Sequence, residues 1–241
     1  MTQSGVIVSS PELCFLQMAG ELTFIDLIRL GYEFCGSYRL DERSAIKKSS
    51  YGVMPLTNIK KLSAYLDKAT RMYGRTDAMN ALRFIIDGSA SPMETILTML
   101  LTLPYKLGGY GFPKPQLNYR IEVSDKVTST KIKPTSRPAF YCDLYWPDKK
   151  VAVEYDSDEY HSGALRIEKD AIRRNALESV GVRMITVSRR QLTDAAKMRE
   201  VSEALSRLLS KRLVYAEKEF TSLNAELMSQ LLPEDSIDKY L

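Results

Sequence analysis

The sequence predicts an α/β protein with an α-helical N-terminal region. Two observations carry this prediction. Apolar residues recur at helical spacing through roughly the first hundred residues, whereas three extended segments with β-branched and aromatic residues follow residue 116. A helix, a short β-rich segment and further helical sequence come after them. The order from residue 91 is therefore helix, three strands, helix, strand and helix.

The composition is that of a globular protein outside the membrane. The chain has 241 residues, of which 44% are hydrophobic and 27% charged, so a disordered chain is excluded. No apolar run approaches the roughly 20 residues of a membrane helix, and the N-terminus lacks the regions of a signal peptide. Three cysteines without a CxxC pair, beside one histidine, argue against a disulfide framework or structural zinc. We therefore expect a cytoplasmic protein with no membrane partner.

The N-terminal region reads as a series of short helices. Ser10 followed by Pro11 is an N-cap with proline at the first helical position, and a second helix runs from Phe24 to a stop at Gly36. Little periodicity marks residues 37–55, which predicts an irregular connection. Further helices are expected over residues 56–73 and 76–86.

The remaining elements follow in order. Ser91 and Pro92 repeat the cap-and-proline start of a helix, and glycine and proline crowd a loop at residues 107–115. Strands are expected at residues 117–123, 140–145, 151–155 and 182–187, with a helix at 163–180. We divide the chain into a helical N-terminal region (1–88), an α/β domain (89–210) and a C-terminal helical extension (211–241).

A predicted β-hairpin brings carboxylates together. The turn sequence after Trp146 joins two strands, and it allows two registers. If Asp148 and Lys149 form the loop, Asp143 lies opposite Glu154; if Pro147 and Asp148 form it, the two are diagonal neighbours. Both registers place the carboxylates on one side, about 5 to 8 Å apart. Asp156 points the same way.

Such carboxylates repel one another unless a cation lies between them. Mg²⁺ or Mn²⁺ is the obvious cation, whereas a solvated strand end would explain the same residues without metal; both interpretations stay open here. Residues 139–163 hold six acidic and two basic side chains, and the segments 114–137 and 164–190 each carry a net charge of +4. An acidic centre between basic flanks favours a metal that acts on a polyanion.

Five motifs occur in consistent order along the chain: SPMET, QLNYR, YCDLYWP, VAVEYDSDEYH and KDAIRRNALESVGVRMITVS. Together they resemble the PD-(D/E)XK nuclease superfamily, in particular its very-short-patch-repair-like (Vsr-like) endonucleases. The resemblance implies a restriction-endonuclease-like core, in which helices flank a mixed central sheet. More weakly, SPELCFLQMA and LIRLGYEFCG resemble the linking region of AbiEi-type antitoxin-linked proteins, although no winged-helix module is visible.

The resemblance implies roles for particular residues. Asp143 and Glu154 would hold the metal with help from Asp156, and Glu94 would act from the first helix of the domain. Asp156 stands where the motif has its catalytic lysine, so His161 is the candidate for handling the proton of the attacking water. A further set of residues could contact nucleic acid: Arg173, Arg174 and Gln116. The arginines could instead pair with Asp170 and Glu178, and Gln116 could lie at a solvated edge.

We therefore expect a Mg²⁺- or Mn²⁺-dependent endonuclease that hydrolyses phosphodiester bonds, with DNA as its nucleic acid, in a defence or toxin-antitoxin context. The alternative is a catalytically inactive nucleic-acid-binding or antitoxin-like regulator that retains the nuclease fold. A third interpretation is a protein-interaction partner in a defence system. A homodimer or a defence-system protein is the further partner that these interpretations allow.

Overall fold

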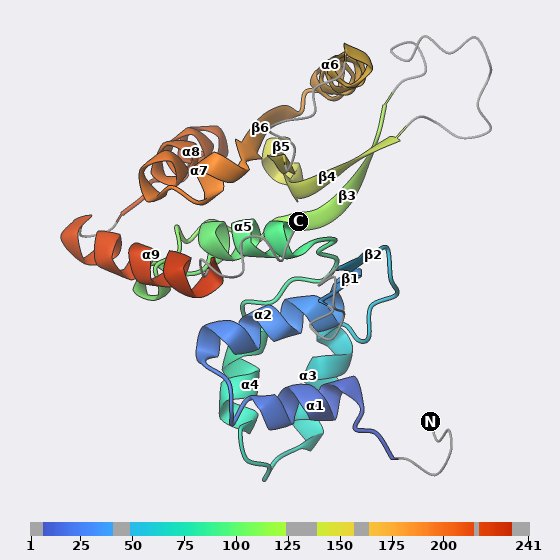
Figure 1. The fold of residues 1–241 in the computed structure, drawn as a ribbon, viewed down its shortest axis with the longest axis vertical. Helices are drawn as coiled ribbons and strands as arrows, with labels where there is room; N and C mark the ends of the chain where they lie inside the picture. Colours follow the sequence, from blue (N-terminus) through green and yellow to red (C-terminus); the bar gives the residue numbers. More distant parts are fainter. Residues whose placement is uncertain (1–6, 41–48, 124–138, 157–163, 215–216, 233–241) are drawn as a thin grey trace. The chain divides into compact units, whose positions relative to one another are not determined.

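The computed structural model describes residues 7–40, 49–123, 139–156, 164–214 and 217–232. Figure 1 shows the chain as a ribbon. The chain separates into two compact units, one formed by Met1–Thr95 with Asp235–Leu241 and the other by Ile96–Glu234. Each unit is described by itself.

The first unit is helical, as predicted. Its helices are α1 (Pro11–Met18), α2 (Phe24–Cys35), α3 (Ile59–Lys68) and α4 (Arg75–Leu82). The Ser10 side chain accepts a hydrogen bond from Leu13 N (3.2 Å), so the predicted cap-and-proline start of α1 is confirmed. The large apolar side chains that α1, α2 and α3 bury together form its core: Phe15, Leu16, Leu27, Ile28, Leu62 and Leu66.

Two expectations for this unit need correction. The helix expected over 56–73 is shorter, because the Asn58 side chain accepts from Lys61 N (2.9 Å) and thereby caps α3 at its start. The connection expected to be irregular contains a two-residue antiparallel pair, β1 (Tyr38–Arg39) and β2 (Ser50–Tyr51). Their pairing is too short to leave a period-2 signal in the sequence.

The second unit contains the α/β core. Helix α5 (Pro92–Thr102) crosses the boundary between the units, and a 3-10 turn, η1 (Tyr105–Leu107), follows it. The strands are β3 (Gln116–Glu122), β4 (Ala139–Trp146), β5 (Val151–Asp156) and β6 (Arg183–Ser188). The helices after β5 are α6 (Ala164–Ser179), α7 (Arg189–Leu192), α8 (Ala195–Leu209) and α9 (Glu217–Leu231). The predicted order of elements from residue 91 is confirmed.

The four strands form one mixed sheet in the order β3-β4-β5-β6 (Figure 1). β3, β4 and β5 are successive antiparallel neighbours, whereas β6 runs parallel to β5 and is reached through α6. The β5–β6 register aligns Glu154 with Thr186. Because α6 connects two adjacent parallel strands, it must return across the sheet and can cover one face of it.

Apolar side chains bury both faces of the sheet along β5 and the adjoining end of β4. On one face, Leu177 of α6 packs with Cys142, Tyr145 and Ala152. Leu144, Val151 and Val153 alternate with these residues and are also fully buried. Burying a charged side chain on such a strand costs free energy unless the charge is paired. Glu154 lies on β5 under this constraint.

The glycine-rich loop before β3 is confirmed, and its glycines have a structural reason. Gly108 adopts a φ of +81°, and a Cβ atom there would lie 2.2 Å from the Leu223 carbonyl oxygen of α9. The buried Asn224 side chain donates to the Gly108 carbonyl oxygen (2.7 Å). The loop therefore fixes α9 against the rest of the second unit through contacts that only glycine permits. Among the described residues, no helix is long and apolar enough to cross a membrane.

Candidate active site

The β4–β5 hairpin has the first of the two predicted registers. Tyr145 pairs with Ala152 and Leu144 with Val153, the register in which Asp143 comes opposite Glu154. The connection is wider than two residues, because a 3-10 turn at Pro147–Lys149 is followed by Lys150 in the left-handed region (φ 49°). The strand ends that carry the two carboxylates are therefore brought together as predicted.

Asp143 interrupts the regular alternation of β4. Cys142 and Tyr145 are three positions apart yet belong to the same core cluster, so the strand changes face between them. On β3 the residue opposite Asp143 is Asn118, whose φ is +47°. Asp143 Oδ2 accepts a hydrogen bond from Tyr155 N of β5 (2.8 Å). In a regular pair of strands this amide would donate to a backbone carbonyl oxygen. Here the Asp143 carboxylate accepts its hydrogen bond instead.

Glu154 is the buried carboxylate of the site, with 10% of its side chain exposed. Its Oε1 atom accepts from Nη2 of Arg173 at 2.5 Å. Burial raises the pKa of Glu154 above its usual value of 4.5, and this effect outweighs Arg173 and the Cys142 thiol, which both lower it. The ionised form of Glu154 therefore needs a nearby cation to stabilise it.

Asp143 and Glu154 both lie near the Cys142 thiol. Burial raises the pKa of Cys142 to about 12, and the charges of Glu154 and Asp143 contribute in the same direction. The structure thus brings together, around one buried thiol, the two carboxylates that the hairpin prediction singled out. Their placement fits the prediction, although Asp143 reaches Tyr155 N rather than the pocket described next.

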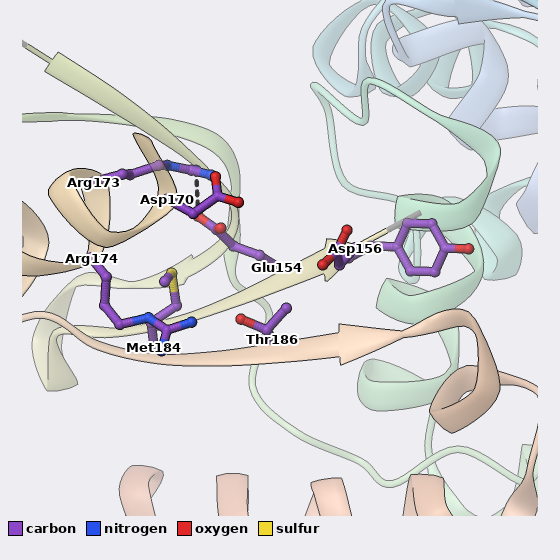
Figure 2. Close-up of a pocket in the computed structure, with 8 residues that line it drawn as sticks. Glu154, Asp156, Asp170, Arg173, Arg174, Met184 and Thr186 are labelled. Carbon is purple, nitrogen blue, oxygen red and sulfur yellow. Dashed lines mark hydrogen bonds and ion pairs between the residues drawn. The ribbon is translucent and has the colours of Figure 1, made fainter. Parts of the chain in front are cut away.

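A pocket of about 150 Å³ lies where β5, α6 and β6 meet. Its walls are formed by Glu154, Tyr155, Asp156, Asp170, Arg173, Arg174, Met184 and Thr186. Figure 2 shows Glu154 directed toward Arg173 and Asp170, with Asp156 further along β5. Three carboxylates and two guanidinium groups thus line one small cavity, which suits a ligand that combines a cation with an anionic group.

The two arginines have different surroundings. Arg173 donates to Glu154 and also to the Tyr141 carbonyl oxygen of β4, a pairing that the sequence did not predict. The sequence offered Asp170 and Glu178 as its partners because only residues on the same helix are visible as neighbours in a sequence. Arg174 is exposed and lines the pocket, where it is placed to meet a ligand.

Two predicted site residues, Gln116 and Glu94, do not line this pocket. Gln116 is exposed at the start of β3, opposite Tyr145, and is not among the residues that line the pocket. Glu94 belongs to the first unit, where its Oε2 accepts from Ala90 N (3.0 Å) while its own amide donates to Ser91 Oγ (3.1 Å). The second bond caps the start of α5 through Ser91, and the first satisfies the amide of the residue just before that cap. His161 lies outside the described residues.

The donor set fits a hard divalent cation by its chemistry. Within the described part of the chain, no group of three or more His, Cys, Asp or Glu side chains is arranged to hold a metal ion. Mg²⁺, however, typically takes only one or two carboxylates and completes its shell with phosphate and water. Glu154 with Asp143 or Asp156 meets that requirement in type and number.

Asp170 and Thr186 are pocket residues that sequence reasoning did not place in the site. Asp170 precedes Arg173 by three residues and was visible only as an ion-pair partner. Thr186 enters because β6 runs parallel to β5 and aligns it with Glu154. Only the tertiary fold, which places α6 and β6 beside β5, reveals these two.

Comparison of the chain with family models, curated proteins and solved structures finds no match.

Proposed function

We propose that the protein is a metal-dependent endonuclease that hydrolyses phosphodiester bonds of nucleic acid, with DNA as the expected substrate. The pocket where Glu154, Asp156 and Asp170 lie beside Arg173 and Arg174 carries this proposal. Phosphodiester hydrolysis needs carboxylates for a metal and cations for phosphate, and both are within the same 150 Å³.

Each residue has a part that follows from its position. Glu154 and Asp143 would hold the cation with Asp156 assisting, because they are the carboxylates that the β4–β5 hairpin brings to one strand end. A bound Mg²⁺ ion would polarise the phosphate and lower the pKa of the attacking water. The exposed guanidinium of Arg174 would bind a phosphate oxygen. His161 stays the candidate that accepts the proton of the attacking water.

The arrangement of elements supports the proposed restriction-endonuclease-like core. A helix precedes a three-stranded antiparallel meander, and α6 then leads to a strand parallel to β5. This is a mixed sheet with a helix packed on it, as the resemblance implies. The proposed metal ligands lie on the two central strands, β4 and β5.

One observation favours a second candidate, a nucleic-acid-binding regulator without catalytic turnover. Glu154 already pairs with an internal cation, Arg173, and position 156 carries an aspartate where the motif has a lysine. A site of this kind can bind phosphate through Arg174 while it fails to activate water. Cleavage distinguishes the two candidates, because both predict binding of nucleic acid.

The test is cleavage of supercoiled plasmid, single-stranded DNA and RNA by the purified full chain in Mg²⁺, in Mn²⁺ and in EDTA. We expect metal-dependent product with at least one substrate and none in EDTA. Binding of nucleic acid without cleavage in either metal would replace the nuclease by the regulator. Absence of both binding and cleavage would reject both candidates.

A further inference from the structure

The guanidinium of Arg173 lies between two oxygen atoms that a hard cation also uses. Its Nη2 atom is 2.5 Å from Glu154 Oε1 and 2.5 Å from the Tyr141 carbonyl oxygen. Carboxylate and backbone carbonyl oxygens are typical ligands of hard divalent cations. Strands β4 and β5 therefore direct two oxygen ligands at one point, and a positive charge from α6 fills that point.

Burial explains why a cation is held there. The Glu154 side chain is 10% exposed, and an ionised carboxylate in such surroundings is costly without a counter-charge. Arg173 supplies that charge. A divalent cation bound to Glu154 would meet the same guanidinium at close range, where like charges repel. Arg173 and the metal therefore compete for one carboxylate.

The Arg173 side chain can move away from Glu154 within the pocket. Its side chain is 32% exposed, and it lines the same pocket as Arg174, the next residue on α6 (Figure 2). A phosphate group that enters this pocket offers two oxygen atoms to the planar guanidinium of Arg173, which can bind both at once. Release of Glu154 would then accompany capture of the phosphate.

We propose, building on the proposed function, that Arg173 is a positioning residue that occupies the cation position of the metal-free site. A phosphodiester anion draws it away from Glu154, so nucleic acid and metal bind with positive coupling. By thermodynamic reciprocity, metal raises the affinity for nucleic acid by the same factor. The site thus binds its metal more tightly once a substrate is bound.

The test is equilibrium binding of Mn²⁺, measured by electron paramagnetic resonance on the full chain, with and without a 20-base-pair phosphorothioate DNA duplex. Arg173→Met is compared with Arg174→Met, which removes the same charge from the same helix and pocket. Without duplex, we expect Arg173→Met to bind Mn²⁺ at least about 10-fold more tightly than Arg174→Met, which corresponds to loss of one charge-assisted competitor. The gain in Mn²⁺ affinity caused by the duplex should shrink in Arg173→Met by a similar factor.

Equal Mn²⁺ affinities in the two variants, with equal coupling to the duplex, would overturn the inference, because only a general charge effect would remain. Folding of each variant is verified by the fluorescence of Trp146. Should Arg173→Met fail to fold, Arg173→Gln replaces it with the same expected direction. If the wild-type protein cleaves in Mn²⁺ but the variants do not differ in Mn²⁺ affinity, this inference fails alone. If the wild-type protein neither binds Mn²⁺ nor cleaves with it, the proposed function fails first.

Discussion

A double-mutant cycle on Glu154 and Arg173 tests the contact on which the geometry of the site depends. The cycle compares wild type, Glu154→Gln, Arg173→Met and the double variant. Arg173 also donates to the Tyr141 carbonyl, but that bond is lost in both Arg173→Met backgrounds and cancels. The cycle therefore isolates the charge-dependent part of the interaction between the two side chains, because the amide oxygen in Glu154→Gln can still accept from Arg173.

The magnitude follows from burial. Fully exposed ion pairs contribute about 0.2 to 1 kcal/mol, whereas hydrogen bonds to charged groups contribute about 1.5 to 3 kcal/mol. The Arg173 side chain is 32% exposed and that of Glu154 is 10% exposed, so solvent screens the pair only in part. We expect a coupling free energy of about 1.5 to 2 kcal/mol, in the lower part of the second range.

The assay is urea unfolding in EDTA, followed by tryptophan fluorescence. The chain has one tryptophan, Trp146, which is buried in β4 and donates to the Pro113 carbonyl oxygen (2.8 Å). Its signal therefore reports on the unit that contains the site. A coupling free energy below about 0.5 kcal/mol, the value of a solvated surface pair, would refute the contact.

Three further predictions concern the same unit. Asp143→Asn should abolish cleavage yet change the free energy of unfolding by less than about 1 kcal/mol, because the amide oxygen can still accept from Tyr155 N. A nicking assay measures the first effect and urea unfolding the second. Cleavage at the wild-type rate would exclude Asp143 as a metal ligand. Burial raises the pKa of Glu154 above 4.5, so between the unfolded and folded pKa values the folded state holds a proton that the unfolded state has lost. The free energy of unfolding of the wild type should therefore fall as pH rises above about 4.5, and Glu154→Gln should lack this pH-dependent component. Identical pH profiles of the two proteins would contradict the burial argument. Burial, followed by the charge of Glu154, raises the pKa of Cys142 to about 12. Iodoacetamide at pH 8 should therefore label the half-buried Cys14 in the native protein well before Cys142, as measured by mass spectrometry of tryptic peptides. Fast labelling of Cys142 would mean an open β4–β5 edge.

The sequence was most informative where local chemistry decides the structure. Ser10 with Pro11 predicts the start of α1, and the turn after Trp146 predicts the hairpin, including the register found among two alternatives. These features depend on neighbours a few residues apart. Even so, the turn was longer than either alternative because Lys150 adopts a left-handed conformation, which sequence patterns rarely require of lysine.

What could not be predicted depends on tertiary packing. Arg173 reaches Glu154, which lies 19 residues earlier in the chain, because α6 folds back over the sheet. The change of face at Asp143 likewise needs Asn118 of β3 opposite it. The sequence left open whether a metal or solvent offsets the repulsion of the carboxylates; at Glu154 a guanidinium from the same chain does so. Periodicity and spacing carry no information on such distant partners.

The most direct test of catalysis in this pocket is the initial rate of Mg²⁺-dependent cleavage by Glu154→Gln, measured beside Glu178→Gln. Both variants lose one carboxylate, but Glu178 is exposed on α6 and does not line the pocket. The two proteins are purified in parallel, so a contaminating nuclease would act equally in both. We predict that Glu178→Gln cleaves at the wild-type rate and that Glu154→Gln is slower by at least about 100-fold. Equal rates in the two variants would contradict the assignment of catalysis to this site.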